Sequence, residues 1–218
     1  MLPLTLITTK SPDEVTPAIV AGCARLVPGE APMFVERQPF AGAKINKCTF
    51  NVRQFIAENP GEMVLGWEIC VWDGVLLDCI GHAIVKHEDR VRCVTPSKYG
   101  DSRLLFLPDS RISFDFDDPM ARMPAKQVPL STHPEVLRFI EVDAAEYAIK
   151  IKYPVLPGPM MVQGEDAVTL QRLAREKQRL SLKLILMKSD NKTKCPCGSG
   201  KKFRKCHRAA IEQMLKYQ

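Results

Sequence analysis

Short apolar runs dominate the first 110 positions, and their length and spacing are typical of β-strands. Four of them are MVLGWEICVW, VLLDCIGHAIVK, RVRCVTP and RLLFLPD, at residues 63–72, 75–86, 90–96 and 103–109. Asp73-Gly74 and Glu88-Asp89 separate consecutive runs and suit tight hairpin turns. A shorter run, MFVE, adds a strand at residues 33–36. The pattern therefore predicts a sheet of antiparallel strands.

Helical patterns precede, interrupt and follow this sheet. Ser11 and Thr16 are each followed by proline, so they are alternative N-caps of a first helix that ends near residues 27–29. Three further helices are expected at residues 48–58, 135–149 and 165–188, the last of them long and charged. Residues 115–134 read as irregular, and Trp67 and Trp72 as core residues of an apolar strand.

Composition places the chain among ordinary globular proteins. Its 218 residues are 45% hydrophobic and 26% charged. The N-terminal segment lacks the basic and apolar regions of a signal peptide, and no apolar run is long enough to span a bilayer. Eight cysteines without an export signal indicate reduced thiols that serve as core residues, metal ligands or a nucleophile. We therefore expect a cytoplasmic protein without membrane insertion.

Positive charge is concentrated at the C-terminal end. The net charge is +6, yet residues 171–218 hold 14 Lys or Arg against 3 Asp or Glu. The preceding 170 residues hold the other 17 cations and 22 acidic residues, so they are mildly acidic. A basic block of this kind favours nucleic acid or an acidic protein surface, or it is simply a solvated helix face that also offsets metal-bound thiolates.

The segment CPCGSGKKFRKCH, residues 195–207, has the residue types of a metal site. Cys195, Cys197, Cys206 and His207 offer three thiolates and an imidazole, which are the ligands of structural zinc. Gly198 and Gly200 allow the sharp turns that a C-x-C pair requires. We expect Zn²⁺ to supply the folding energy, because so short a segment has no hydrophobic core of its own.

The same segment resembles the SEC-C motif, the zinc module of the C-terminus of the preprotein translocase ATPase. The resemblance covers only about the last 25 residues, including the CGSGKK run. It implies a docking element that recognises a protein or ribonucleoprotein partner, such as a chaperone or the ribosome. The contact surface that it implies consists of Lys201, Lys202, Phe203, Arg204 and Lys205.

These observations predict an α+β fold: an antiparallel sheet with packed helices, followed by a long helix and a small C-terminal zinc knuckle. We expect an α+β body at residues 1–164 and a connecting helix at 165–188. A polar linker at residues 189–194 would lead to the zinc module at 195–218, where Ile211, Met214 and Leu215 form a short amphipathic finish.

The body also raises the question of cysteine chemistry. Cys48 begins a predicted helix, where free backbone N–H groups stabilise a thiolate, and His82 and Thr95 follow on later strands. This order resembles transglutaminase-like and papain-like cysteine enzymes, which implies Cys48 as nucleophile and His82 as base. The aspartate expected as third group is missing, since Cys93 precedes Val94-Thr95, so Thr95, Asp101 or a backbone carbonyl would have to substitute. Equally, Cys48 and His82 fit ordinary core positions.

Three functions therefore remain open. The first is a zinc-binding SEC-C protein that docks its body onto a protein or ribonucleoprotein. The second is a cysteine hydrolase or transferase that uses Cys48 and His82. The third is a nucleic-acid-associated regulator or inhibitor that uses the basic residues 171–218. No phosphate-binding loop or dinucleotide fingerprint is present in the sequence.

Overall fold

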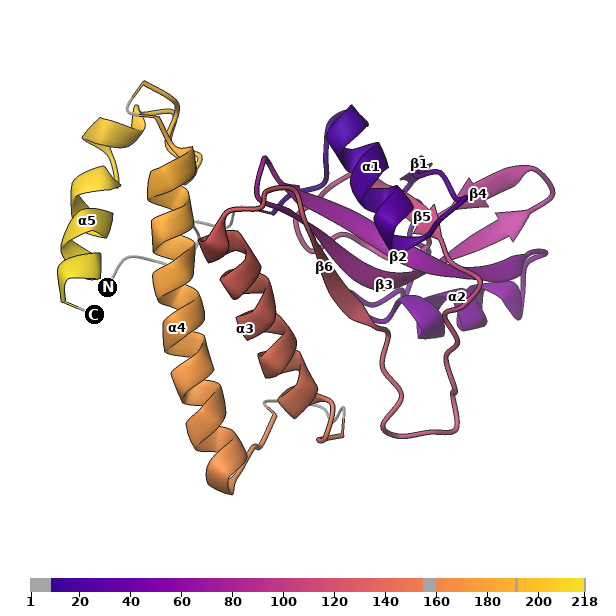
Figure 1. Cartoon of the computed structure of the whole chain (residues 1–218). Helices are drawn as coiled ribbons and strands as arrows, with labels where there is room; N and C mark the ends of the chain where they lie inside the picture. The colour runs from indigo at the N-terminus through magenta and orange to yellow at the C-terminus, as the bar shows by residue number, and fades with distance from the viewer. Residues whose placement is uncertain (1–8, 155–159, 191, 218) are drawn as a thin grey trace. The chain divides into compact units, whose positions relative to one another are not determined.

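The computed structural model describes residues 9–154, 160–190 and 192–217 (Figure 1). Helices and antiparallel strands are combined in one α+β fold, as predicted. The packing of the backbone divides the chain into two units. One unit, the sheet unit, comprises residues 10–71 and 77–128, and the other, the helical unit, comprises residues 72–76 and the described residues from 129 to 217.

Six strands form the sheet, in the order β1-β5-β2-β3-β4, with β6 paired to β3 as well. Their bounds are Met33–Glu36 (β1), Glu62–Trp72 (β2), Leu76–His87 (β3), Arg90–Arg92 (β4), Arg103–Pro108 (β5) and Ala125–Pro129 (β6). Glu88 and Gly74 have positive φ values of 53° and 64°, which is where the two predicted hairpin turns lie. The strand predictions are thus correct to within a few residues, except that β6 lies in a segment that we expected to be irregular.

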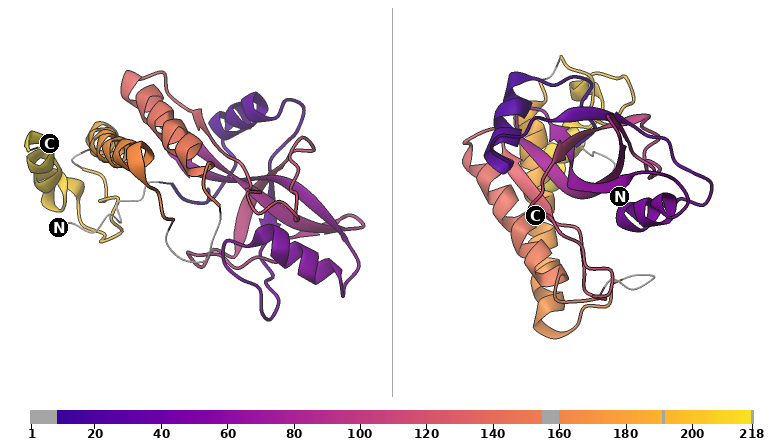
Figure 2. Two further views of the ribbon diagram at one scale, coloured as in Figure 1. Left: turned by 90° about the horizontal axis from the view of Figure 1, so that it is seen from below. Right: turned by 90° about the vertical axis from the view of Figure 1, so that its right-hand side faces the viewer.

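The sheet curls so that its two ends meet. Arg37, next to β1, and Cys93, next to β4, form a parallel bridge. Cys93 N donates to Glu36 O at 2.9 Å, and Gln38 N donates to Cys93 O at 2.7 Å. The right-hand view of Figure 2 shows the strands running round the resulting curve. Closure of this kind satisfies backbone groups that an open sheet would leave at its edges.

Two apolar clusters lie on the two faces of this curved sheet. The inner cluster includes Val35, Ile84 and Phe106. On the other face, helix α2 (Cys48–Ile56) buries Val52 and Phe55 against Ala83, Val85 and Val94. Successive residues of a strand point to opposite faces, which is why positions 83 and 85 face α2 while position 84 faces inward. Helix α1 (Pro17–Leu26) begins after Thr16, whose hydroxyl accepts a hydrogen bond from Ile19 N.

The helical unit is built on two antiparallel helices, α3 (Pro134–Lys150) and α4 (Gly164–Lys188), which lie side by side in Figures 1 and 2. Lys177 of α4 forms ion pairs with Asp143 and Glu146 of α3, and Arg138 Nε pairs with Glu176 Oε1 at 2.7 Å. The 3₁₀-helix η1 (Phe203–Lys205) and helix α5 (Arg208–Lys216) follow, and α5 contacts α4. Helix α3, which we grouped with residues 1–164, thus packs against α4.

Candidate metal centre

A tight loop brings the first two cysteines of the C-terminal segment into place. Lys194 and Lys202 form an antiparallel bridge, and Cys195 N donates to Lys201 O at 2.8 Å. Gly198 and Gly200 turn the chain between the two bridged residues with φ values of 77° and 72°, where a side chain is disfavoured. The loop therefore places the thiols of residues 195 and 197 on one short stretch of backbone. Asn191, in the predicted linker, lies outside the described residues.

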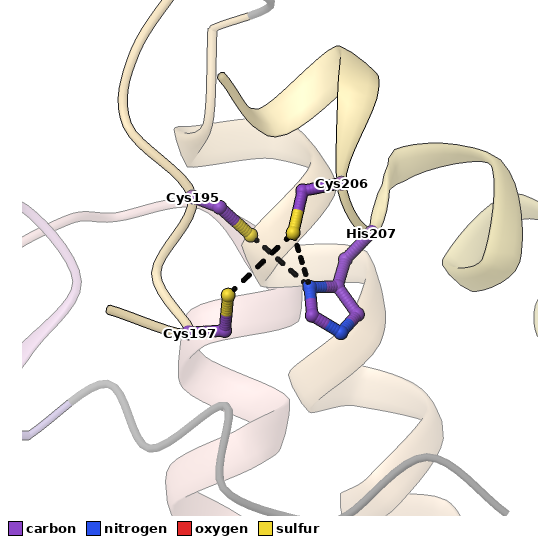
Figure 3. A group of neighbouring side chains, drawn as sticks. All are labelled: Cys195, Cys197, Cys206 and His207. Atoms are coloured by element: carbon purple, nitrogen blue, oxygen red, sulfur yellow. Dashed lines mark hydrogen bonds between the residues drawn. The ribbon is translucent and has the colours of Figure 1, made fainter. Parts of the chain in front are cut away.

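The second pair of ligands follows η1. Cys206 is the residue after this single turn, and His207 precedes the first residue of α5. Figure 3 shows the four side chains pointing toward a common centre. Cys195 Sγ and Cys206 Sγ each lie 3.2 Å from His207 Nδ1, and Cys197 Sγ lies 3.6 Å from Cys206 Sγ. All four donor atoms lie within 4.8 Å of one another.

These distances fit a tetrahedral zinc ion. Zn–S bonds of about 2.3 Å and Zn–N bonds of about 2.0–2.1 Å imply S···S separations of about 3.8 Å and S···N separations of about 3.5 Å. The observed separations of 3.6 and 3.2 Å are close to these values. Four protein donors also complete the coordination of zinc, whereas a catalytic ion keeps one position for water. The cluster is thus a candidate structural metal site whose donor set suits Zn²⁺.

Ser199 is a member of this site that the sequence did not single out. Its hydroxyl oxygen lies 3.1 Å from Cys197 Sγ and 3.4 Å from Cys206 Sγ. Without metal, the hydrogen bonds from the side chain and backbone of Ser199 lower the pKa of Cys197 to about 6, while burial raises the pKa of Cys195 to about 11. The hydroxyl can therefore stabilise thiolate charge. The run CGSG holds the only sequence signal for this role, since Ser199 lies between the two turn glycines.

The cations around this centre are exposed, but the aromatic residue among them is not. Lys201, Lys202, Arg204 and Lys205 all lie at the surface. Phe203 has an exposed fraction of 0% and belongs to the core of the helical unit, together with Ile211 of α5 and Leu184 of α4. Phe203, which we expected in the contact surface, is therefore a core residue.

The segment thus shares a hydrophobic core, contrary to the expectation that metal alone would supply its folding energy. Met214 and Leu215 pack against the same cluster, as do the half-buried thiols of Cys197 and Cys206. Residue 195 is itself buried in this cluster. The candidate metal ligands and the core residues alternate along the same short segment, so bound metal would stabilise η1 and α5 together with this apolar packing.

The structure places Cys48, His82 and Thr95 in the sheet unit, but among the described residues no direct hydrogen bond joins any two of these three side chains. Cys48 is half-buried and packs with the cluster that contains Ala83, under α2. His82 lies one residue before Ala83 on β3, so its side chain points to the other face of the strand. Thr95 Oγ1 accepts a hydrogen bond from Asn51 Nδ2 at 3.1 Å, whereas the ring nitrogens of His82 contact Glu68 and Cys93.

His82 instead belongs to a buried polar network that the sequence did not reveal. Its Nδ1 lies 3.4 Å from Glu68 Oε2, and its Nε2 lies 3.2 Å from Cys93 Sγ. Arg37 Nη2 donates to Glu68 Oε1 at 2.6 Å, and Arg37 Nη1 donates to Thr95 O at 3.2 Å. The members of this network come from separate parts of the chain between positions 37 and 95, and they meet where the two ends of the sheet join. No spacing in the sequence signals this arrangement.

The network is close to electrically balanced, because Arg37 and Glu68 form an ion pair while the imidazole of His82 and the thiol of Cys93 are uncharged. Burial lowers the pKa of His82 to about 3, with a further contribution from the positive charge of Arg37. Burial raises the pKa of Cys93 to about 11. A neutral ring that donates from Nδ1 to Glu68 leaves Nε2 facing the Cys93 sulfur, and the Cys93 thiol also lies within hydrogen-bond reach of Thr95 O at 3.5 Å. The base that a Cys48 nucleophile would require is therefore occupied by another cysteine.

We expect Cys48 to react slowly with iodoacetamide at neutral pH. Burial raises its pKa above the ordinary value, although backbone N–H groups of Ala83 and Thr49 favour the thiolate. The thiol is then protonated at pH 7, and the rate should rise only above the roughly 8.5 of a free cysteine. Mass spectrometry of zinc-loaded protein, with Cys48→Ser as control, measures this rate against pH. Fast alkylation with an apparent pKa below 7 would instead revive the nucleophile hypothesis.

The comparison with protein families agrees with the metal centre. Residues 193–209 match the SEC-C motif, and this match includes all four donor residues. The chain therefore carries a SEC-C motif with a candidate zinc site at its centre. No significant match was found among curated proteins or solved structures, and the resemblance to transglutaminase-like and papain-like enzymes gains no support. Within the described ranges, no helix is both long and apolar enough to cross a bilayer.

Proposed function

We propose that the SEC-C motif is a zinc-held docking module that brings the rest of the chain to an anionic protein or ribonucleoprotein surface. The observation that carries this proposal is that residues 201–205 divide into a buried anchor and an exposed charged surface. Its aromatic member is buried, while its four cations are exposed. A fixed loop with exposed cations can bind an anionic surface without folding at the moment of contact, which lowers the entropic cost of binding.

Three features of the site support a binding function over a catalytic one. The four donors fill a zinc coordination sphere and leave no place for a substrate or a water. Four positive charges in five residues exceed what three thiolates and one neutral imidazole require for balance. Lys192 and Lys194 are exposed as well and extend the same positive charge. Long-range attraction of this kind speeds the encounter with an anionic partner.

Purified ribosomes and a fluorescein-labelled acidic peptide are suitable probes for the proposed docking. The full zinc-loaded chain would be tested by cosedimentation and by fluorescence anisotropy, at about 50 and 300 mM salt. The test variant carries glutamine at Lys201, Lys202, Arg204 and Lys205. The matched control loses the same charge at exposed positions of the sheet unit, namely Lys44, Lys86, Arg90 and Lys98.

We expect the test variant to lose at least about tenfold in affinity, because several charge-assisted contacts disappear together. The control should bind like the parent chain, and both variants should retain their metal. Equal affinity of the test variant and the control would contradict the proposal. Competition by naked RNA as strong as that by ribosomes, with a steep salt dependence, would favour the nucleic-acid-associated function instead.

Catalysis by Cys48, His82 and Thr95 stays a separate prediction. Its one favourable feature is the position of Cys48 at the first residue of α2, with backbone N–H groups nearby. The contacts of His82 with Cys93 and Glu68 speak against it. The alkylation profile of Cys48 decides between these two observations.

A further inference from the structure

A pocket of about 530 Å³ opens within the sheet unit, remote in sequence from the SEC-C motif. Its lining combines an apolar floor with a group of polar and charged side chains. The apolar members are Leu26 at the end of α1, Trp67 on β2, Ile112 and Pro124. The polar members are Asp109, Arg111, Ser113, Arg122 and Lys126. Its volume lies in the range of small-molecule sites, which are largely apolar with a few directed polar groups.

Arg111 is held in place by its neighbours. Its Nε and Nη2 donate to the two carboxylate oxygens of Asp109 at 2.8 and 2.9 Å, and Nη2 also donates to Leu26 O at 2.8 Å. Trp67 Nε1 donates to Asp109 as well, at 2.9 Å. The hydrogen bonds from Arg111 lower the pKa of Asp109 to about 2, so this carboxylate stays ionised. The guanidinium is thus fixed by three hydrogen bonds of its own before any ligand arrives, and Trp67 holds the carboxylate that it binds.

The remaining nitrogen of this guanidinium is free to bind. In the part of the chain that the structure describes, Arg111 Nη1 has no hydrogen-bond partner, and the side chain is 61% exposed. Fixed guanidinium groups bind carboxylates and phosphates well, because their planar N–H groups match the geometry of these anions.

Pro124, which also lines the pocket, is held in place as well. Gly81 N donates to Pro124 O at 2.6 Å, which joins the segment before β6 to β3. A Cβ atom at Gly81 would lie 2.7 Å from Pro124 Cδ, so only glycine allows this close approach. The segment that carries Arg122 and Lys126 is therefore attached to the sheet, and the pocket is formed before binding.

The charge of the lining is positive in an otherwise acidic part of the chain. Three cations and one carboxylate give the lining a formal excess of two positive charges. Residues 1–170 as a whole carry more acidic residues than cations. We infer that this pocket binds a small organic anion, with a carboxylate or phosphate group at Arg111, Arg122 and Lys126 and an apolar body against Trp67.

Trp67 can report this binding directly, because its ring lines the pocket. A Trp72→Phe variant of the full chain leaves Trp67 as the single tryptophan, and Trp72 lies in the core of the other unit. Phenyl phosphate and 3-phenylpropionate are the two anionic probes, and 3-phenylpropanol is the neutral probe. Titrations follow Trp67 fluorescence, and calorimetry on the parent chain provides a second measurement without the Trp72 substitution.

Replacement of Arg122 and Lys126, the two lining cations besides Arg111, is the decisive test of anion binding. Arg122→Gln together with Lys126→Gln should weaken the binding of the anionic probes at least about tenfold, since charge-assisted hydrogen bonds are lost. The control, Arg90→Gln with Lys98→Gln, removes the same charge from exposed residues that do not line the pocket. It should bind as the parent chain does, and circular dichroism checks that both variants remain folded.

The outcomes separate clearly. Saturable binding of either anionic probe that is lost in the test variant supports the inference, and the stronger of the two probes identifies the acid group as phosphate or carboxylate. Equal binding of the neutral probe, equal affinity of test and control variants, or no saturable binding of any probe would each overturn it.

Discussion

Replacement of Cys206 with serine should remove the bound metal and destabilise the end of the helical unit. Cys206 lies beside both Cys197 and His207, so its loss breaks two of the contacts that surround the candidate ion. Structural zinc in small modules contributes about 10–16 kcal/mol of apparent binding free energy at pH 7, and this energy is coupled to folding. We therefore expect the metal content to fall from about one ion per chain to near zero, and the thermal transition to shift downward.

Elemental analysis of the purified chain measures this change and identifies the metal at the same time. Cys48→Ser is the matched control, because it removes a half-buried thiol that lies outside the cluster. Full metal content in the Cys206→Ser variant, or none in the parent chain, would be incompatible with the proposed zinc site. A metal other than zinc would keep the site and change its occupant.

Truncation of Phe203 to alanine should cost about 3–5 kcal/mol of unfolding free energy, as is usual for a fully buried phenylalanine. The ring is completely buried among α4 and α5 residues, so its removal leaves a cavity next to the metal ligands. Denaturant unfolding followed by circular dichroism measures the loss. Phe203→Leu should cost less, because it retains most of the apolar volume.

Tyr217 provides the control for this second change, since it is aromatic, lies near the same end of the chain and is 82% exposed. Tyr217→Ala should change the unfolding free energy by less than about 0.5 kcal/mol. A loss below about 1 kcal/mol for Phe203→Ala would show that the ring is not buried in solution. Retention of metal in Phe203→Ala, together with loss of stability, would separate the contribution of apolar packing from that of the metal.

Local signals in the sequence were sufficient for most elements. Thr16 followed by proline gave the true start of α1, because Pro17 tolerates the first helical position but not a later one. The earlier alternative at Ser11 would have placed this proline inside the helix. Strand β6 was missed because AKQVP combines polar residues with a terminal proline and carries little strand signal. Its pairing with β3 is a tertiary contact that local sequence does not encode.

The candidate sites likewise include residues that the local sequence signals and residues that only tertiary contacts bring together. The four metal ligands fall within 13 residues, so their spacing was visible in the sequence. The burial of Phe203 depends on apolar residues of α4, about 20 positions earlier in the chain. The cations that flank Phe203 instead led to the prediction of an exposed contact residue. The network of Arg37, Glu68, His82 and Cys93 joins several strands and had no motif at all. Helix and strand order suggested a pairing of Cys48 with His82, but the pleat of β3 turns the imidazole to the other face.

The pairing of β1 with β5 also has a consequence for the order in which this protein can fold on the ribosome. Val35 pairs with Leu104, so β1 must wait for nearly 70 further residues before its partner exists. At synthesis rates of about 5–20 residues per second, this delay lasts several seconds. During that time Val35, buried in the finished protein, lacks the strand that pairs with it. Cys93, the bridge partner of Arg37, is likewise made long after it, so the sheet cannot curl closed until most of the sheet unit has been synthesised.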